Sequence, residues 1–195
     1  MIKKTCFLGH RDYIYPQAIE RTINAIQYVI DNGCRQFAMG THGNYDELAL
    51  SECRDFRKKY EDIKIEVILT SYHKIEKKVL YTYKNDDGEI EEVIDTPPYQ
   101  DVNTTMYEIE DLHFKQQITE SNKQMIDDCD AVICYVNPKR ERSGAKKALK
   151  YAQKKGLLII NCYDEKDEPT YGMTEEQKKK YFNKFMESIR KRPTN

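Results

Sequence analysis

Residues 130–161, DAVICYVNPKRERSGAKKALKYAQKKGLLIIN, decide the fold of this chain. They begin with a continuous apolar run, DAVICYV, that is typical of a strand buried on both faces. A polar loop, NPKRERSG, leads into AKKALKYAQKKG, which has helical spacing and ends at Gly156. A second apolar run, LLIIN, follows at once. The order strand, helix, strand at this spacing predicts a βαβ unit with parallel strands and a right-handed crossover.

The first part of the chain shows the same alternation of elements. Apolar runs predict strands at residues 3–8, 36–39 and 63–69. The segments between them predict helices, the first with Pro16 in its opening turn and the second over residues 45–59. Residues 114–128 resume helical spacing. Helices that alternate with continuous apolar strands predict an α/β fold, a doubly wound, mostly parallel Rossmann-like sheet.

Residues 71–113 interrupt this alternation and are polar and aromatic. The stretch VLYTYKNDDGEIEEVID places the turn signal Asp87-Gly88 between two alternating segments, which predicts an inserted β-hairpin or a flap over the site. The stretch DTPPYQDVNTT that follows is predicted to be a loop. We therefore expect one Rossmann-like domain over residues 1–195, with a hairpin inserted at residues 71–113.

Composition limits the function classes. With 195 residues, 39% of them apolar and 33% charged, and no apolar run of membrane-spanning length, we expect a protein with no membrane partner. The first apolar run stops at Leu8, too early for a secretory signal, and none of the six cysteines form a C-x-x-C pair. These features favour reduced thiols and a cytoplasmic location. A net charge of −1 gives no global attraction for nucleic acid.

Three predicted strands lead into residues suited to binding a ligand. They are Gly9-His10-Arg11, Gly40-Thr41-His42-Gly43-Asn44 and, through a loop, Arg142-Ser143-Gly144. In an open parallel sheet, ligands bind at the carboxyl ends of the strands, near the point where the strand order reverses. Glycines there permit close approach, and the helix starts that follow offer N–H groups and a positive dipole to an anion. We therefore expect a cradle for the phosphate of a nucleotide-like small molecule.

Individual side chains refine this expectation. Arg11 offers a planar fork that suits phosphate, and Thr41, Asn44 and Ser143 add neutral donors. His10 and His42 flank the cradle as further donors, and no other metal ligands stand at suitable spacing, so we expect neither a metal nor a cofactor.

Two carboxylates, Asp46 and Glu47, follow the glycine bend. Asp46 either complements the dipole of the helix start or contacts a ribose hydroxyl. Glu47 is a candidate general acid or base if it faces inward, and otherwise a solvated side chain on the helix surface. The roles of both residues stay open at the level of sequence.

The stretch GTHGNYDELA, residues 40–49, resembles the glycine-rich signature of the SLOG superfamily, which includes DNA-processing protein A and the Lonely Guy phosphoribohydrolases. FLGHR and RSGAKKALKYAQKKGLLIIN are similar to the matching segments of its small bacterial YpsA-like branch. The resemblance covers residues 3–70 and 114–162. It implies a Rossmann-like fold with a nucleotide or nucleotide-sugar site. The residues implied to line that site are Gly9, Arg11, Gly40, Gly43, Asp46, Ser143 and Gly144.

The chain departs from the catalytic members of that superfamily. Lonely Guy enzymes carry a P-G-G-x-G-T-x-x-E segment, and related deoxyribosyltransferases carry a Glu shortly after Ser-Gly-Thr. This chain has Lys146-Lys147-Ala148 in that region and no such Glu. A carboxylate that stabilises an oxocarbenium ion or attacks an anomeric carbon is therefore missing from the expected place.

Three functions remain open from the sequence. The first is a nucleotide-binding sensor or sequestering protein, favoured because phosphate donors are present and the catalytic Glu is not. The second is an N-glycosidic bond (phosphoribo)hydrolase that uses Glu47 or Asp46. The third is a DNA-handling protein that uses the basic stretch KRERSGAKKALK, disfavoured by the net charge and by the lack of interleaved aromatic residues. A homo-oligomer is compatible with all three.

Overall fold

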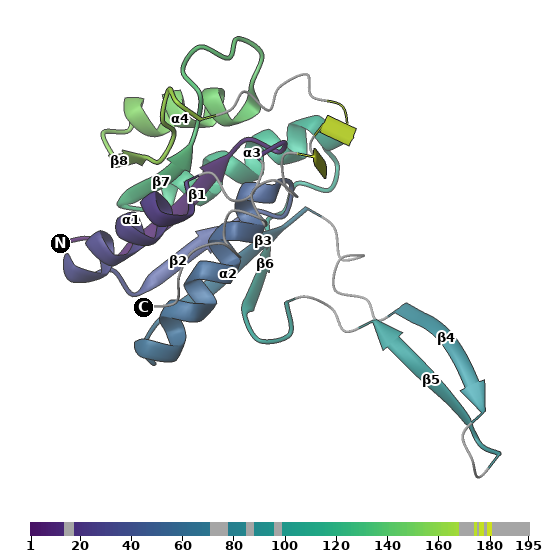
Figure 1. The fold of residues 1–195 in the computed structure, drawn as a ribbon. Helices are drawn as coiled ribbons and strands as arrows, with labels where there is room; N and C mark the ends of the chain where they lie inside the picture. The colour runs from purple at the N-terminus through teal and green to yellow at the C-terminus, as the bar shows by residue number, and fades with distance from the viewer. Residues whose placement is uncertain are drawn as a thin grey trace.

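The computed structural model describes residues 1–13, 18–70, 78–84, 88–95, 99–167, 174, 176, 177, 179 and 180. Its centre is a six-stranded sheet in which every neighbouring pair is parallel, in the order β6-β3-β2-β1-β7-β8 (Figure 1). The strands are β1 (Lys4–Gly9), β2 (Gln36–Met39), β3 (Lys64–Leu69), β6 (Asn103–Met106), β7 (Ala131–Tyr135) and β8 (Leu158–Asn161). The predicted doubly wound α/β fold is confirmed.

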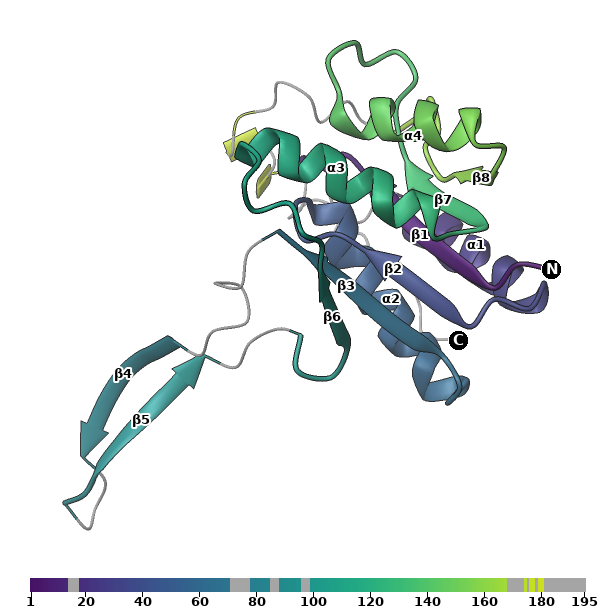
Figure 2. The same cartoon turned by 180° about the vertical axis from the view of Figure 1, so that it is seen from behind.

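Helices cover both faces of the sheet. Two of them, α1 (Ile19–Asp31) and α2 (Asn44–Lys59), pack on one face, and α3 (Phe114–Asp127) and α4 (Gly144–Lys154) on the other (Figures 1 and 2). Alternate strand residues supply the two cores: Phe7, Phe37 and Ile133 contact the α1–α2 layer. Burial on both faces explains why the central strands read as continuous apolar runs. Within the described residues, no helix is both long and apolar enough to span a bilayer.

The strand order reverses beside β1. The chain runs outward from β1 through β2, β3 and β6, then returns to place β7 on the other side of β1 and β8 beyond it. β1 and β7 pair from Thr5 and Ala131 to Gly9 and Tyr135. In a sheet of this kind, the crevice between two such strands is where ligands bind.

The helix bounds agree with the sequence to within a few residues. α1 begins at Ile19, and Pro16, which the sequence places in its first turn, lies outside the described residues. Gly33 and Gly156, each just past a helix, have φ values of 99° and 77°, which favour glycine because it has no Cβ.

One segment predicted to be a loop is a strand. Residues 103–105 of DTPPYQDVNTT, with Met106, form β6 and pair in parallel with β3. β6 is the edge of the sheet, so its side chains are only partly buried and the sequence NTTM carries no apolar run. Thr105 donates its hydroxyl hydrogen to Glu66 on β3, and Glu66 also pairs with Lys4 at 2.6 Å. The prediction was wrong because a polar edge strand lacks the apolar pattern by which buried strands are recognised.

The inserted hairpin is present as a separate two-stranded antiparallel sheet of β4 (Lys78–Lys84) and β5 (Ile90–Asp95). Both views show it extending away from the six-stranded sheet (Figures 1 and 2). Gly88 in its turn has a φ of 81°, whereas Asp87 lies outside the described residues. The chain that returns from the hairpin is tied to α2 by Asp101, which pairs with Arg54 and Arg57 at 2.5 Å each. Whether the hairpin closes over a ligand or packs on another subunit stays a prediction.

Deletion of residues 77–96 should leave the α/β core folded. The cut removes neither a central strand nor a helix, and residues 70–76 with 97–102 remain to run back along β3, a path of about 20 Å. Circular dichroism should keep its α/β signal, and the melting temperature should change by no more than about 4 °C, or about 1 kcal/mol.

A longer deletion that also removes β6 is the contrasting control. It should lower the melting temperature clearly, because it exposes the edge of β3. Global unfolding after the shorter deletion would mean that the hairpin belongs to the core.

Candidate functional site

A cavity of about 240 Å³ opens where β1, β2 and β7 end, beside the middle of α3 and the start of α4. It brings together residues from all three groups that the sequence singles out. These are Gly9, His10, Arg11, Gly40, His42, Gly43, Asp46, Arg142, Ser143 and Gly144. The cavity therefore lies at the reversal of strand order, where an open parallel sheet places its ligands.

Three candidate residues lie outside the cavity lining. Asn44 is exposed and donates its side-chain amide to the carbonyl of Tyr13 at 2.9 Å, so it holds two loops together. Thr41 is half-buried in the same bend. Glu47 is exposed on α2 and does not line the cavity.

The cavity also contains residues that the sequence did not single out as ligand-binding. They are Phe7, Leu8, Ile118, Asn122, Arg140 and Ala145. Ile118 and Asn122 are one turn apart on α3, the helix that leads from β6 back to β7. The one signal for them in the sequence is helical spacing. That spacing predicts a helix, but it does not predict over which strand ends the helix lies.

Two of the glycines that follow strands are required by packing within the protein. A Cβ on Gly9 would lie 2.4 Å from the Cβ of Tyr45, and a Cβ on Gly43 would lie 2.8 Å from the Cα of Arg11. Gly43 is therefore where the β2–α2 bend rests against the backbone that follows β1. A Cβ on Gly144, in contrast, would meet nothing within 4 Å.

The start of α2 is closed by the protein itself. Asp46 Oδ2 accepts the backbone N–H groups of His42 at 3.0 Å and Gly43 at 3.1 Å. The N–H of Asn44 donates to the carbonyl of Arg11 at 3.2 Å. These amides, which the sequence suggested as anion donors, are thus already engaged, and Asp46 acts as a cap on its own helix.

The start of α4 is open to the cavity. Ser143 caps the helix, because its Oγ accepts the N–H of Lys146 at 3.1 Å. The N–H groups of Gly144 and Ala145 make no hydrogen bond to any described residue, and both residues line the cavity. An unfilled helix N-terminus that faces a cavity is suited to an anion.

Three guanidinium groups surround the same opening. Arg11 donates its Nε to the carbonyl of His42 at 2.9 Å, which orients its side chain across the bend. Arg140 pairs with Asp12 at 2.6 Å and is largely buried. Arg142 is exposed and contacts no acidic side chain within the described residues. Because Asp46 is the one carboxylate among the described lining residues, the cavity is positively charged.

His10 is buried at the base of the cavity, with 5% of its surface exposed. Its Nε2 accepts the N–H of Asn137 at 2.9 Å, and its Nδ1 lies 3.2 Å from Ser143 Oγ. Burial, with the nearby Arg140, lowers the pKa of His10 from 6.5 to about 4. The ring is therefore neutral at physiological pH.

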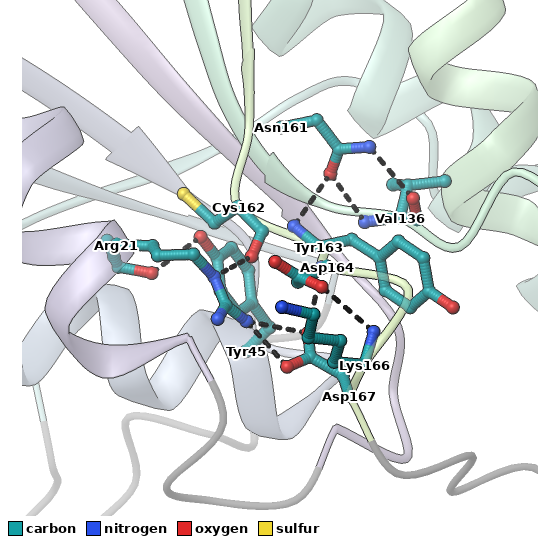
Figure 3. Close-up of polar contacts among 10 residues, drawn as sticks. Arg21, Tyr45, Val136, Asn161, Cys162, Tyr163, Asp164, Lys166 and Asp167 are labelled. Atoms are coloured by element: carbon teal, nitrogen blue, oxygen red, sulfur yellow. Dashed lines mark hydrogen bonds and ion pairs between the residues drawn. The ribbon is translucent and has the colours of Figure 1, made fainter.

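The chain just before Asn137 is fixed by the neighbouring strand, β8. Asn161 accepts the N–H of Val136 at 3.1 Å and donates to the Val136 carbonyl at 2.9 Å (Figure 3). The chain after β8 is in turn tied to α1, because Arg21 donates to the Cys162 carbonyl at 2.7 Å and to both carboxylate oxygens of Asp167 (Figure 3). The end of β7, and with it the partner of His10, is thus rigidly placed.

Protonation of His10 should destabilise the fold in acid. Its folded-state pKa lies below the unfolded value, so the unfolded chain binds the proton first and stability falls as the pH drops from 6.5 towards 4. The loss attributable to His10 should reach about 3 kcal/mol near pH 4. Urea unfolding of the wild type and of His10→Gln at several pH values measures this loss. It is the difference between the two proteins in how steeply the unfolding free energy changes with pH. Parallel pH profiles for the two proteins would show that His10 does not titrate this way.

The glycine contacts predict a contrast between two alanine variants. Gly43→Ala should lose about 1–3 kcal/mol of unfolding free energy, because its new methyl group meets the backbone of Arg11. Gly144→Ala, in the same cavity but with open space around it, should be neutral or gain about 0.5 kcal/mol. Urea denaturation at pH 7 compares them, and equal losses would contradict the backbone contact.

No family model matches this chain, and no curated protein matches it either.

Proposed function

We propose that this protein binds a nucleotide or a nucleotide-derived phosphate compound and acts as its sensor or sequestering protein. The observation that carries the proposal is the open start of α4. There the N–H groups of Gly144 and Ala145 face the cavity beside the Ser143 hydroxyl. Two adjacent amides at a helix N-terminus match the oxygens of a phosphate group.

Charge around the cavity supports an anionic ligand. Arg142, which has no acidic partner among the described residues, stands next to the open amides, with Arg11 and Arg140 further along the wall. Guanidinium groups bind phosphate through paired, charge-assisted hydrogen bonds. The phosphate is therefore proposed to sit at the α4 end of the cavity and not at the α2 end, where Asp46 already occupies the amides.

The rest of the cavity supports a ligand with more than a phosphate. Leu8 and Ile118 give it apolar surface, and Asn122 and Asp46 add polar groups. Ligand pockets commonly combine an apolar wall with a few placed polar groups. A base against the apolar wall, with sugar hydroxyls near Asp46, fits this distribution.

Binding without cleavage is favoured over hydrolysis. Glycosidic chemistry ordinarily uses two carboxylates around the bond, and the described part of the cavity lining contains Asp46 alone. Its Oδ2 accepts two backbone N–H groups, which makes that oxygen a weaker nucleophile and base. Glu47, the other candidate, is exposed outside the lining.

Two further features support the biological setting of this proposal. The stretches that resemble the SLOG superfamily all contribute to this one cavity, in keeping with membership of that nucleotide-binding group. All six cysteines are buried and unbridged, which favours the reducing cytoplasm.

Calorimetric titration with a panel of nucleoside monophosphates, nicotinamide dinucleotides and cyclic nucleotides tests the proposal. At least one of these compounds should bind. Arg142→Ala should make its binding free energy less favourable by about 1.5–3 kcal/mol, the range for a charge-assisted hydrogen bond. Lys147→Ala, an exposed cation on α4 outside the lining, is the matched control and should change affinity little. No binding by any member of the panel would refute the proposal.

The same mixtures decide between binding and turnover. Chromatography should recover each ligand intact after long incubation, and Glu47→Gln should bind as the wild type does. If the wild type releases free base and Glu47→Gln or Asp46→Asn no longer does so, the protein is a hydrolase instead. Preferential, strongly salt-dependent binding of a DNA oligonucleotide would favour the DNA-handling alternative.

A further inference from the structure

The hydrogen-bond direction at His10 is fixed by a backbone group. The N–H of Asn137 can only donate, and it points at His10 Nε2 from 2.9 Å. Nε2 must therefore present its lone pair. A neutral imidazole has one N–H and one lone pair, so the hydrogen of His10 lies on Nδ1.

That hydrogen is directed at Ser143. Nδ1 lies 3.2 Å from Ser143 Oγ, and the reverse direction would require an imidazolate with both nitrogens accepting. Ser143 Oγ also accepts the N–H of Lys146 at 3.1 Å. A hydroxyl oxygen accepts two hydrogen bonds and donates one, so both acceptor positions of Ser143 are filled.

The hydroxyl hydrogen of Ser143 therefore has to be used elsewhere. Among the described residues, no acceptor lies within reach of this hydroxyl hydrogen. Ser143 is nevertheless buried, with only 7% of its surface exposed. Its exposed part faces the cavity, beside the open amides of Gly144 and Ala145. A buried donor left unused is costly, so a bound acceptor is favoured at this point.

We infer that His10 is a positioning residue that turns Ser143 into an obligate hydrogen-bond donor, and that this donor recognises a phosphoryl oxygen of the ligand. With the two α4 amides, it makes a subsite of three donors and no acceptor. Such a subsite accepts a phosphate or a similar oxyanion and rejects a ligand that presents a hydroxyl or ammonium hydrogen there. The inference rests on the proposed function for the identity of the ligand, but not for the direction of the hydrogen bonds.

The same arrangement excludes a serine nucleophile. A base that activates Ser143 would have to take its proton on Nδ1, and Nδ1 already carries a hydrogen. The pair thus resembles a serine–histidine catalytic dyad in composition and differs from one in proton placement. Ser143 binds its ligand without forming a covalent bond to it.

Nitrogen-15 NMR of the ring nitrogens tests the direction of the His10–Ser143 hydrogen bond without any ligand. In the labelled full-length protein at pH 7, His10 should give a protonated Nδ1 and an unprotonated Nε2. His10→Gln identifies the signal by its disappearance. A protonated Nε2 would overturn the inference whatever the cavity binds.

Binding measurements test the role of the donor. The probes are the nucleoside monophosphate that binds most tightly and its parent nucleoside. Ser143→Ala should weaken binding of the monophosphate roughly tenfold and leave binding of the nucleoside unchanged. Ser121→Ala removes an equally buried serine hydroxyl from α3 and should affect neither. His10→Asn keeps an amide donor near Nδ1, whereas His10→Gln extends past it, so affinity should be retained better in His10→Asn.

The outcomes separate the two proposals. Equal weakening of both probes, or none, in Ser143→Ala would overturn the phosphate-donor role, as would labelling of Ser143 by a fluorophosphonate probe. Failure of every monophosphate to bind the wild type would instead refute the proposed function, and the ring-nitrogen signals would still decide the direction of the hydrogen bonds.

Discussion

The parallel pairing of β1 with β7 is the constraint on which the rest of this structure depends. At its amino end, Asp130 Oδ2 accepts the N–H groups of Lys3 and Lys4 at 2.8 and 3.1 Å, and these bonds hold the pKa of Asp130 below its ordinary value. At its carboxyl end, the N–H of His10 donates to the Tyr135 carbonyl at 3.3 Å. A slip of one residue would turn every core side chain to the other face. The register therefore fixes His10 against Asn137, and with it the whole α4 side of the cavity.

The two helices that begin at the cavity, α2 and α4, differ in whether the backbone N–H groups at their starts are already hydrogen-bonded. The start of α2 is satisfied internally, because Asp46 and the Arg11 carbonyl accept its first N–H groups. The start of α4 has its cap, Ser143, and leaves its first two amides open. Gly43 immediately precedes α2, Gly144 is the first residue of α4, and both helix starts have a positive dipole end. The difference comes from Asp46, at the third helical position of α2 where α4 has Lys146, and from the Arg11 carbonyl, which accepts the N–H of Asn44. This difference favours the proposed anion at the α4 end of the cavity and leaves the α2 end for other groups of the ligand.

Several residues at the binding edge serve the fold and the site together. Gly9 and Gly43 allow Tyr45 and the backbone of Arg11 to pack closely, and that packing places the neighbouring polar groups. His10 satisfies a buried N–H at Asn137 and supports the cap of α4. Such double use explains why a glycine or a histidine at a strand end is ambiguous in the sequence. The residue type is the same whether the neighbour that requires it is a ligand or another part of the chain.

The α/β class, the buried central strands and the inserted hairpin could be predicted from the sequence alone, because they follow from local periodicity and turn chemistry. The sequence also placed most of the cavity residues, since the carboxyl ends of parallel strands share one edge of the sheet. It missed β6, whose polar edge position carries no apolar pattern, and it missed Ile118 and Asn122, which depend on the path of α3 across the strand ends. Only the tertiary structure decided that Glu47 is exposed, that Asp46 closes α2, and which way the hydrogens of His10 and Ser143 point. The reason is physical: the partners that orient the His10 ring, Asn137 and Ser143, lie more than a hundred residues away along the chain, and no local pattern records them.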